Sequence, residues 1–106
     1  MSAERYRSLA LALPGAEEKA HFGKADFRVR NKIFASLRDG STGVAKLTPE
    51  QQAMLMAAEP RHLTPASGAW GRQGWTRIAL DGADDALLQS VLKMAWTNIA
   101  PKSLMA

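Results

Sequence analysis

Polar and apolar residues alternate with a period of two between residues 26 and 47, and two turn signals divide this stretch. Asn31 follows Arg30 at the first division, and asparagine tolerates the positive φ of a tight turn. The dipeptide Asp39-Gly40, at the second division, is typical of β-hairpins. Because successive strand residues point to opposite faces of a sheet, this pattern predicts three consecutive antiparallel strands with one face towards solvent.

The alternation also predicts which side chains share a face. In the first strand Phe27 and Val29 are expected on one side, and the other side holds Asp26, Arg28 and Arg30. In the second strand, residues 32–38, one predicted set is Ile33, Ala35 and Leu37. The other set is Lys32, Phe34, Ser36 and Arg38, and its basic residues are expected to share the solvent face with Arg28 and Arg30. The third strand covers residues 42–47. A short strand over residues 17–22 and another over residues 75–80 are also expected, while residues 60–74 are predicted as a loop with a short strand near 61–64.

Three helices are predicted around these strands. Residues 48–51 (Thr-Pro-Glu-Gln) form a capping-box sequence with proline at the first helical position, so a helix is expected from there to about Ala58. A first helix is expected over residues 2–13, capped by Ser2, and a last helix carries an apolar stripe over residues 87–99. This order predicts an α+β domain in which an antiparallel sheet has helices packed on one face.

The composition sets limits on function. A length of 106 residues fits a single domain, residues 1–106, and an apolar content of 46% suffices for a hydrophobic core. The absence of cysteine excludes disulfides, thiolate metal sites and a cysteine nucleophile. No stretch reaches the roughly 18 apolar residues of a membrane span, and the first residues lack a cleavable signal pattern. We therefore expect a cytoplasmic location and no membrane partner.

Several short segments, taken in order, resemble one known family over nearly the whole chain. These segments are residues 13–18 (Leu-Pro-Gly-Ala-Glu-Glu), 27–29 (Phe-Arg-Val), 32–37 (Lys-Ile-Phe-Ala-Ser-Leu), 47–51 (Leu-Thr-Pro-Glu-Gln), 74–80 (Gly-Trp-Thr-Arg-Ile-Ala-Leu) and 100–102 (Ala-Pro-Lys). The ordered set resembles the MmcQ/YjbR family. The resemblance implies a frataxin-like fold, described in this family as a double-wing, DNA-binding type of arrangement. It implies no established activity and no known functional residues.

One property of frataxins is not expected here. Frataxins bind iron through a strongly acidic first helix, whereas this first helix places Glu4 beside Arg5 and Arg7. A hard cation would find too few oxygen ligands there. We therefore expect no iron delivery, and no cofactor.

Two other motifs resemble binding sites but are not expected to form them. Glu18 and His21 have a spacing used by carboxylate metal sites on helices, but the pair occurs once and lies in a predicted strand, with Glu17 and His62 as the remaining candidate ligands. The glycines of residues 68–74 precede a strand and lack a following Lys-Ser or Lys-Thr pair, so a turn-rich connection is expected rather than a phosphate loop.

Catalysis is not predicted. Serine-based chemistry needs a base and an orienting acid close to the hydroxyl, and the chain contains no Gly-x-Ser-x-Gly or comparable pattern. Glu17 and Glu18 are adjacent, so on a strand they would face opposite sides. We expect a non-enzymatic protein, with an active site assembled from distant residues as the open alternative.

The basic residues give the leading functional hypothesis. The chain has a net charge of +4, and the stretch from residue 60 to 80 holds basic residues without an acidic one. Basic strand faces and loops can contact a phosphate backbone, and an exposed tryptophan can stack on a base or sugar. The predicted nucleic-acid-binding residues, for double-stranded DNA, are Arg28, Arg30, Lys32, Arg72, Arg77 and Trp70.

Two simpler interpretations stay open. Charged residues on the outer face of a sheet also serve solubility, and Asp26 and Asp39 dilute the basic set. Trp96 and Trp75 are expected in or near the core, so Trp70 alone is a recognition candidate, and it could equally cover the core edge. The alternative function is an adaptor that binds a protein or a small anion through the open sheet face and residues 60–76, with no role in nucleic-acid binding.

Overall fold

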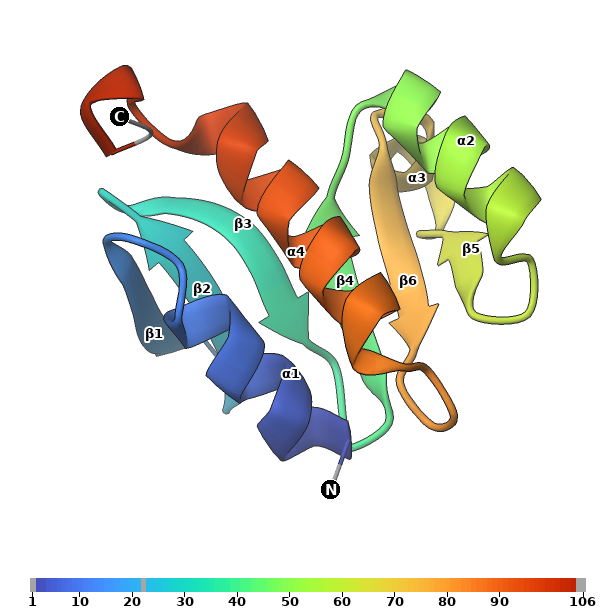
Figure 1. Ribbon diagram of the computed structural model, residues 1–106, viewed down its shortest axis with the longest axis horizontal. Coiled ribbons are helices and arrows are strands. Elements are labelled where there is room, and N and C mark those ends of the chain that lie inside the picture. Colours follow the sequence, from blue (N-terminus) through green and yellow to red (C-terminus); the bar gives the residue numbers. More distant parts are fainter. Residues whose placement is uncertain (1, 22, 105–106) are drawn as a thin grey trace.

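A six-stranded antiparallel sheet organises the described part of the chain, residues 2–21 and 23–104 of the computed structural model (Figure 1). Its strands, in chain order, are β1 (Ala16–His21), β2 (Lys24–Val29), β3 (Lys32–Leu37), β4 (Thr42–Lys46), β5 (Leu63–Pro65) and β6 (Trp75–Ala79). The helical segments are α1 (Ser2–Leu11), α2 (Pro49–Ala58), α3 (Gly68–Arg72), α4 (Asp85–Ile99) and the 3-10 turn η1 (Lys102–Leu104). The predicted α+β class is confirmed. The side chain of Ser2, the predicted cap of the first helix, lies outside the described side chains. Phe22, the predicted end of the first strand, lies outside the described residues.

The strand order in the sheet is β1-β2-β3-β4-β6-β5, so the first four strands form a continuous antiparallel meander. The predicted turn between β2 and β3 is confirmed, because Arg30 and Asn31 both have positive φ, 49° and 70°. This is the backbone of a tight two-residue hairpin turn. The hairpin around Asp39 and Gly40 is confirmed as well, since the Arg38 N–H donates to the Thr42 carbonyl at 2.9 Å.

A β-bulge changes the predicted faces of β3. Phe27 pairs with Ala35, but the next residue, Arg28, pairs with Ile33, which leaves Phe34 as an extra residue on β3. A bulge of this kind re-aims the side chains around it. Phe34 is fully buried in the core, and Ile33 is only partly buried, so the predicted placement of Phe34 on the solvent side is wrong.

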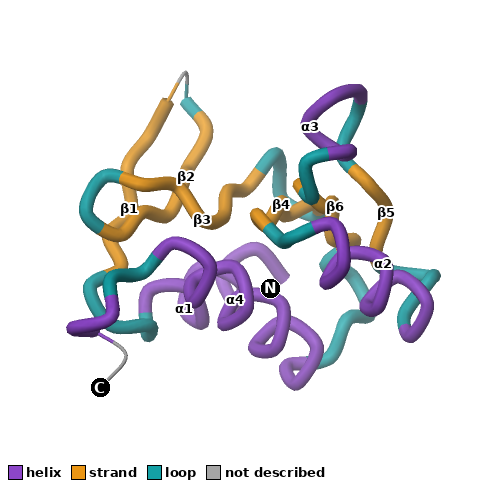
Figure 2. Tube along the Cα trace, turned by 90° about the horizontal axis from the view of Figure 1, so that it is seen from above, coloured by secondary structure: helices purple, strands orange, loops and turns teal. Residues whose placement is uncertain are grey.

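The core lies between the sheet and the helices of one face. Figure 2 shows α1 and α4 side by side beneath the sheet, with α2 at the end of the same layer. The core side chains include Tyr6, Phe27, Val91 and Trp96, and the exposed fraction of each is at most 4%. Trp96 was predicted in the core and is found there, with its indole N–H donating to the Pro14 carbonyl at 2.9 Å.

Tyr6 fixes α1 against the centre of the sheet. Its hydroxyl donates to the Val44 carbonyl at 2.9 Å, and burial raises the pKa of Tyr6 far above its ordinary value. A Cβ atom at Gly43 would lie 2.7 Å from the Tyr6 ring, so only glycine allows the ring to lie on β4. The lack of a side chain at position 43 is therefore a packing requirement.

The predicted cap of α2 is confirmed, and α4 is capped by a side chain as well. At the start of α2 the Gln51 N–H donates to the Thr48 hydroxyl at 3.1 Å, and the Thr48 N–H donates to the Gln51 side-chain oxygen at 3.0 Å. This is the reciprocal capping box expected from the sequence. At the start of α4 the Leu87 N–H donates to the Asp84 carboxylate at 2.8 Å. Among the described helices, none combines the length and the apolar character that crossing a membrane requires.

The segment before β6 is more ordered than predicted. The short strand expected near residues 61–64 is found as β5, and the expected loop after it contains the five-residue helix α3. Positive φ at Gly68 (64°) and Gly74 (110°) turns the chain at either end of α3. Figure 2 shows α3 on the opposite side of the sheet from α1 and α4, so it is the exception to the predicted packing of helices on one face.

Candidate nucleic-acid interface

The sheet face opposite α1 and α4, called the open face below, carries a row of cross-strand neighbours. The strand registers align one residue from each strand across the sheet: Lys19, Asp26, Ser36, Val44, Arg77 and Thr64. The central residues of the adjacent row, Phe27, Ala35 and Ala45, are fully buried against the helices. Side-chain alternation thus separates a polar, accessible face from the core face of the same strands.

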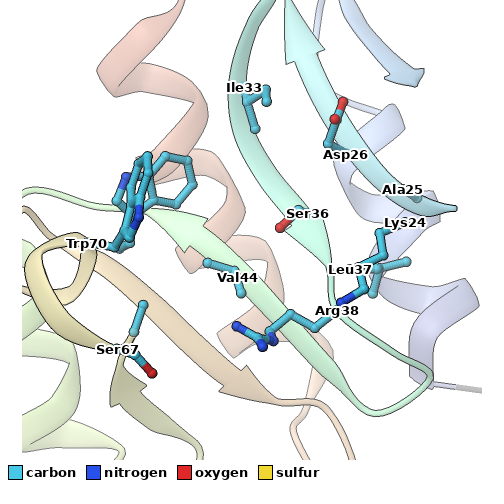
Figure 3. Close-up of a pocket in the computed structure, with 12 residues that line it drawn as sticks. Lys24, Ala25, Asp26, Ile33, Ser36, Leu37, Arg38, Val44, Ser67 and Trp70 are labelled. Carbon is cyan, nitrogen blue, oxygen red and sulfur yellow. The ribbon is translucent and has the colours of Figure 1, made fainter. Parts of the chain in front are cut away.

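A groove of about 440 Å³ lies on the open face (Figure 3). Its base is formed by Ile33, Ser36 and Val44 from two central strands. Figure 3 shows Trp70 on one side, while Arg38 extends over β4 from the other side. The remaining groove residues are Lys24, Ala25, Asp26, Leu37, Ala66, Ser67 and Trp75. The groove therefore combines an apolar base with positively charged residues at one side and an indole at the other.

Trp70 is the most exposed large apolar side chain in the described part of the chain, at 62%. Its ring meets Trp75 edge-to-face, with centroids 5.7 Å apart and an interplanar angle of 75°. The Lys46 ammonium lies 5.8 Å from the Trp75 ring centroid, within the range of a cation–π contact. The orientation of Trp70 is thus supported by a second aromatic ring, although most of its own surface is in solvent.

Gln52 of α2 holds α3 in place. Its side-chain amide lies within 3.1 Å of three acceptors, the carbonyls of Gly71 and Trp75 and the hydroxyl of Thr76. A Cβ atom at Gly74 would lie 1.9 Å from the Leu47 carbonyl oxygen, so this turn requires glycine. These contacts fix the position from which Trp70 projects over the groove.

Arg28, one of the predicted DNA-binding residues, is paired with a carboxylate. Its guanidinium donates to both oxygens of Asp26, at 2.7 and 3.0 Å, and to the Asn31 side chain at 3.2 Å. The hydrogen bond with Asp26 raises the pKa of Arg28 above its ordinary value. The exposed fractions of the Arg28 and Asp26 side chains are 19% and 6%. The charge of Arg28 is therefore balanced within the protein.

Arg77 is also committed to an internal contact. It projects from the open face of β6, and its guanidinium donates to the Ser67 hydroxyl at the start of the α3 segment. Its Nε is buried and has no hydrogen-bond partner among the described residues. Arg77 therefore supports the α3 side of the groove, and only part of its guanidinium is accessible.

The other predicted cations lie at one end of the sheet. Arg30 lies in the β2–β3 turn, Lys32 begins β3, and Arg72 ends α3 just before β6. Because neighbouring strands are antiparallel, the end of β2 and the beginning of β6 lie at the same end of the sheet. All three side chains are exposed. The predicted set thus divides into three exposed cations at this end and two arginines, Arg28 and Arg77, held by internal contacts.

The prediction omitted Lys24 and Arg38, the cations that line the groove. Arg38 was placed on a solvent-facing side by the strand alternation, but nothing in the sequence indicated that it would lie near Trp70. The pairing of Asp26 with Ser36 and of Ser36 with Val44 creates that proximity. Strand register brings together residues that are far apart in sequence, so local sequence patterns could not predict this proximity.

Charge is unevenly divided between the two sides of the sheet. The described side chains of the open face include two of the ten acidic residues, Glu17 and Asp26. They include six basic residues: Lys19, Lys24, Arg28, Arg38, Lys46 and Arg77. The surplus of four positive charges equals the net charge of the whole chain, +4. The open face therefore accounts for the basic character of the protein.

Glu18 and His62, which were considered as metal ligands, make structural contacts instead. Glu18 points to the helix side and accepts from Arg7 at 3.0 Å, so it faces away from Glu17, as expected. The His21 side chain lies outside the described residues, and His62 contacts the Ala79 carbonyl at 3.1 Å through Nδ1. Among the described residues, no three His, Asp or Glu side chains gather as metal ligands.

Comparison with known proteins gives a family and a fold. The YjbR family model matches residues 11–98. The crystal structure of Deinococcus radiodurans protein DR2400, which contains a domain of the family model DUF419, is similar with a TM-score of 0.75 and 23% sequence identity. The similarity covers 92% of this chain and 77% of that chain. No curated protein matches. A likeness to frataxin stays a prediction, whereas the family resemblance is confirmed: the chain belongs to the YjbR family.

Proposed function

We propose that this domain binds nucleic acid without catalysing a reaction, mainly through phosphate contacts on the open face of its sheet. The observation that carries the proposal is the surplus of four positive charges on that face. Phosphate groups attract such a surface, and binding releases the counterions condensed on the polyanion. We propose no nucleic-acid contact for the helix-covered face, because its residues form the core of the protein.

The cations differ in their availability for phosphate contacts. Lys24 and Arg38 are exposed at the groove, and neither forms an ion pair with a described carboxylate within 4.0 Å. Arg30, Lys32 and Arg72 extend the positive surface at one end of the sheet. Arg28 and Arg77 contribute less, since Asp26 and Ser67 already accept their hydrogen bonds. Backbone contacts of this kind position a nucleic acid without reading its sequence.

The two long helices beneath the sheet, α1 and α4, are not proposed as recognition helices. A recognition helix inserts exposed polar side chains into the major groove. The apolar stripe of α4, including Leu88, Val91 and Leu92, is buried against the sheet, and α1 packs beside it. The proposed contacts therefore come from strands and from α3.

An adaptor for a small anion is the second candidate, and the groove favours it. A volume of about 440 Å³ lies within the range of about 300–1,000 Å³ typical of small-molecule sites. A small anion would contact only Lys24 and Arg38, so its binding would depend weakly on salt. Extended phosphate binding depends steeply on salt, which separates the two candidates.

The test is a fluorescence anisotropy titration of labelled DNA, both duplex and single-stranded, at 50 mM and 200 mM salt. With about four phosphate contacts, the affinity for duplex should fall about 100-fold over this range. Absence of binding to either form of DNA at low salt would rule out the proposal.

Matched double variants locate the contact surface. Lys24→Ala with Arg38→Ala removes one lysine and one arginine from the groove. Lys93→Ala with Arg61→Ala removes the same charges from α4 and from the α2–β5 connection, at exposed positions that do not line the groove. The groove variant should lower the salt-dependence slope by about 1.8 for duplex or about 1.4 for single strands. The proposal fails if the control variant has the same effect.

A further inference from the structure

We infer that the domain prefers single-stranded nucleic acid, and that the groove receives one unpaired base against Trp70 while Lys24 and Arg38 contact the flanking phosphates. This inference rests on the proposed function and specifies its ligand. It is carried by the exposed indole, the apolar base of the groove and the placement of the two cations.

Trp70 has the properties of a stacking platform. Its exposed fraction of 62% contrasts with 4% for Trp96, so it contributes little to the core. The edge-to-face contact with Trp75 orients the ring, and three hydrogen bonds from Gln52 support the segment that carries it. Bases stack on such rings regardless of their identity, and removing one aromatic ring typically weakens binding by about 5- to 100-fold.

The chemistry of the groove distinguishes a base from a phosphate. The bottom of the groove contains Ile33 and Val44. An apolar surface of this kind suits the flat face of a nucleobase better than it suits a phosphate group. Ser36 lies among the groove residues and offers a hydroxyl to the polar edge of a base. In Figure 3 Lys24 lies at the side away from Trp70, and the Arg38 guanidinium extends from that side over β4. A nucleotide has this same division into an apolar ring and an anionic group.

One acidic side chain lies within the groove, and its charge is balanced. Asp26 is 5% exposed, and both of its oxygens accept hydrogen bonds from Arg28. The groove therefore presents the charges of Lys24 and Arg38 to a ligand without an opposing free carboxylate. This internal pairing explains how an acidic residue can be part of a surface for anions.

A duplex cannot use the groove in the same way. Its bases are stacked and paired inside the helix, so a base reaches a pocket only after it has been flipped out of the stack. In Figure 2 the β1–β2 hairpin and α3 rise on either side of the open face, and the groove is lined by residues of β2 and of the α3 segment. A single strand can follow such a surface, with bases inward and phosphates towards the cations.

The experiment compares one oligonucleotide of about twelve nucleotides with a hairpin duplex that carries a similar number of phosphates. Affinities are measured by anisotropy at one low salt concentration, and tryptophan fluorescence is recorded in parallel. The wild-type protein should bind the single strand at least about tenfold more tightly, within the range that stacking supplies, and its fluorescence should be quenched.

Variants at Trp70 test the stacking role. Trp70→Ala should weaken single-strand binding by about 5- to 100-fold and duplex binding much less, whereas Trp70→Phe should retain part of the difference. Met54→Ala is the matched control, because Met54 is another exposed apolar side chain, 54% exposed, on α2 and outside the groove. It should change neither affinity.

The outcomes separate the inference from the proposed function. Equal or tighter binding of the duplex, or an equal loss of both affinities in Trp70→Ala, would overturn the single-strand inference while phosphate binding stands. Absence of binding to both DNAs would overturn both. If thymidine monophosphate competes as strongly as the whole oligonucleotide, the groove is a site for a free nucleotide and the inference is also wrong.

Discussion

The two faces of the sheet are built from the same strands, yet they have different tasks. On the helix side, Phe27, Ala35 and Ala45 are neighbours in the register and are fully buried. On the open side, the adjacent residues Asp26, Ser36 and Val44 belong to a row bounded by cations and lie in the groove. Alternate residues of one strand thus serve stability and ligand contact separately.

This division implies that stability and binding can be changed independently. A substitution on the helix side removes buried contacts and should affect binding only through folding. A substitution of an exposed side chain on the open side, such as Lys24 or Arg38, should affect binding with little loss of stability. The following predictions test the separation, beginning with the largest expected effect.

Phe27→Ala should cause the largest loss of stability. Phe27 is fully buried and meets Tyr6 edge-to-face at 6.2 Å between ring centroids. Truncating such a side chain leaves a cavity and lowers the free energy of unfolding by about 3–5 kcal/mol. Urea unfolding monitored by circular dichroism measures the change. Ile33→Ala, on the open face, is the paired control and should cost about 1 kcal/mol. A similar loss in both variants would contradict the division.

Gln52→Ala should affect both properties, because Gln52 connects the helix layer to the groove. Loss of its hydrogen bonds to Gly71, Trp75 and Thr76 should lower the free energy of unfolding by about 1–2 kcal/mol. The looser α3 should also weaken single-strand binding severalfold, measured by anisotropy. Gln89→Ala, an exposed glutamine on α4, serves as the control. Unchanged binding in Gln52→Ala would show that α3 needs no support from α2.

Asp26→Asn should move stability and binding in opposite directions. The substitution weakens the bidentate pair with Arg28 and should lower the free energy of unfolding by about 1–2 kcal/mol. It also removes a negative charge from the groove, so DNA affinity at low salt should rise severalfold. Urea unfolding and anisotropy on the same preparation measure both effects. A loss of affinity would mean that the carboxylate itself contacts the ligand.

Asp85→Asn should have the smallest effect, and it depends on pH. The hydrogen bond from Arg5 lowers the pKa of Asp85 below the ordinary value of 3.8. A lowered pKa stabilises the folded state at neutral pH, and this contribution is lost as the pH falls from about 4 through the lowered pKa. Thermal unfolding should therefore show a slightly lower Tm for the variant at pH 7 and converging values in acid. DNA binding at pH 7 should be unchanged, since the pair lies between α1 and α4.

Local patterns were sufficient for most of the fold. The turn at Arg30 and Asn31 and the capping box at Thr48 each depend on a few adjacent residues, and both are found as predicted. The bulge at Phe34 was missed because it inserts one residue without any glycine or proline to indicate it. Helix α3 was missed because its five residues include two glycines and have no apolar stripe.

The candidate site was predicted less completely. The sequence indicated a basic face and singled out Trp70, whose exposure at the groove is consistent with a recognition role. It could not show that Asp26 pairs with Arg28, because such a contact depends on rotamers rather than on spacing. The sequence also could not show that Lys24 and Arg38 lie at the groove, since their positions follow from the registers of three strands.

Amide chemical shifts of isotope-labelled protein, followed during titration with a short single-stranded DNA at low salt, test the central claim most directly. Binding at the open face predicts that the largest shifts come from the groove residues Lys24, Ile33 and Arg38 and from the Trp70 indole, while α4 shifts little. Shifts concentrated on α1 and α4, with the groove unchanged, would contradict the account.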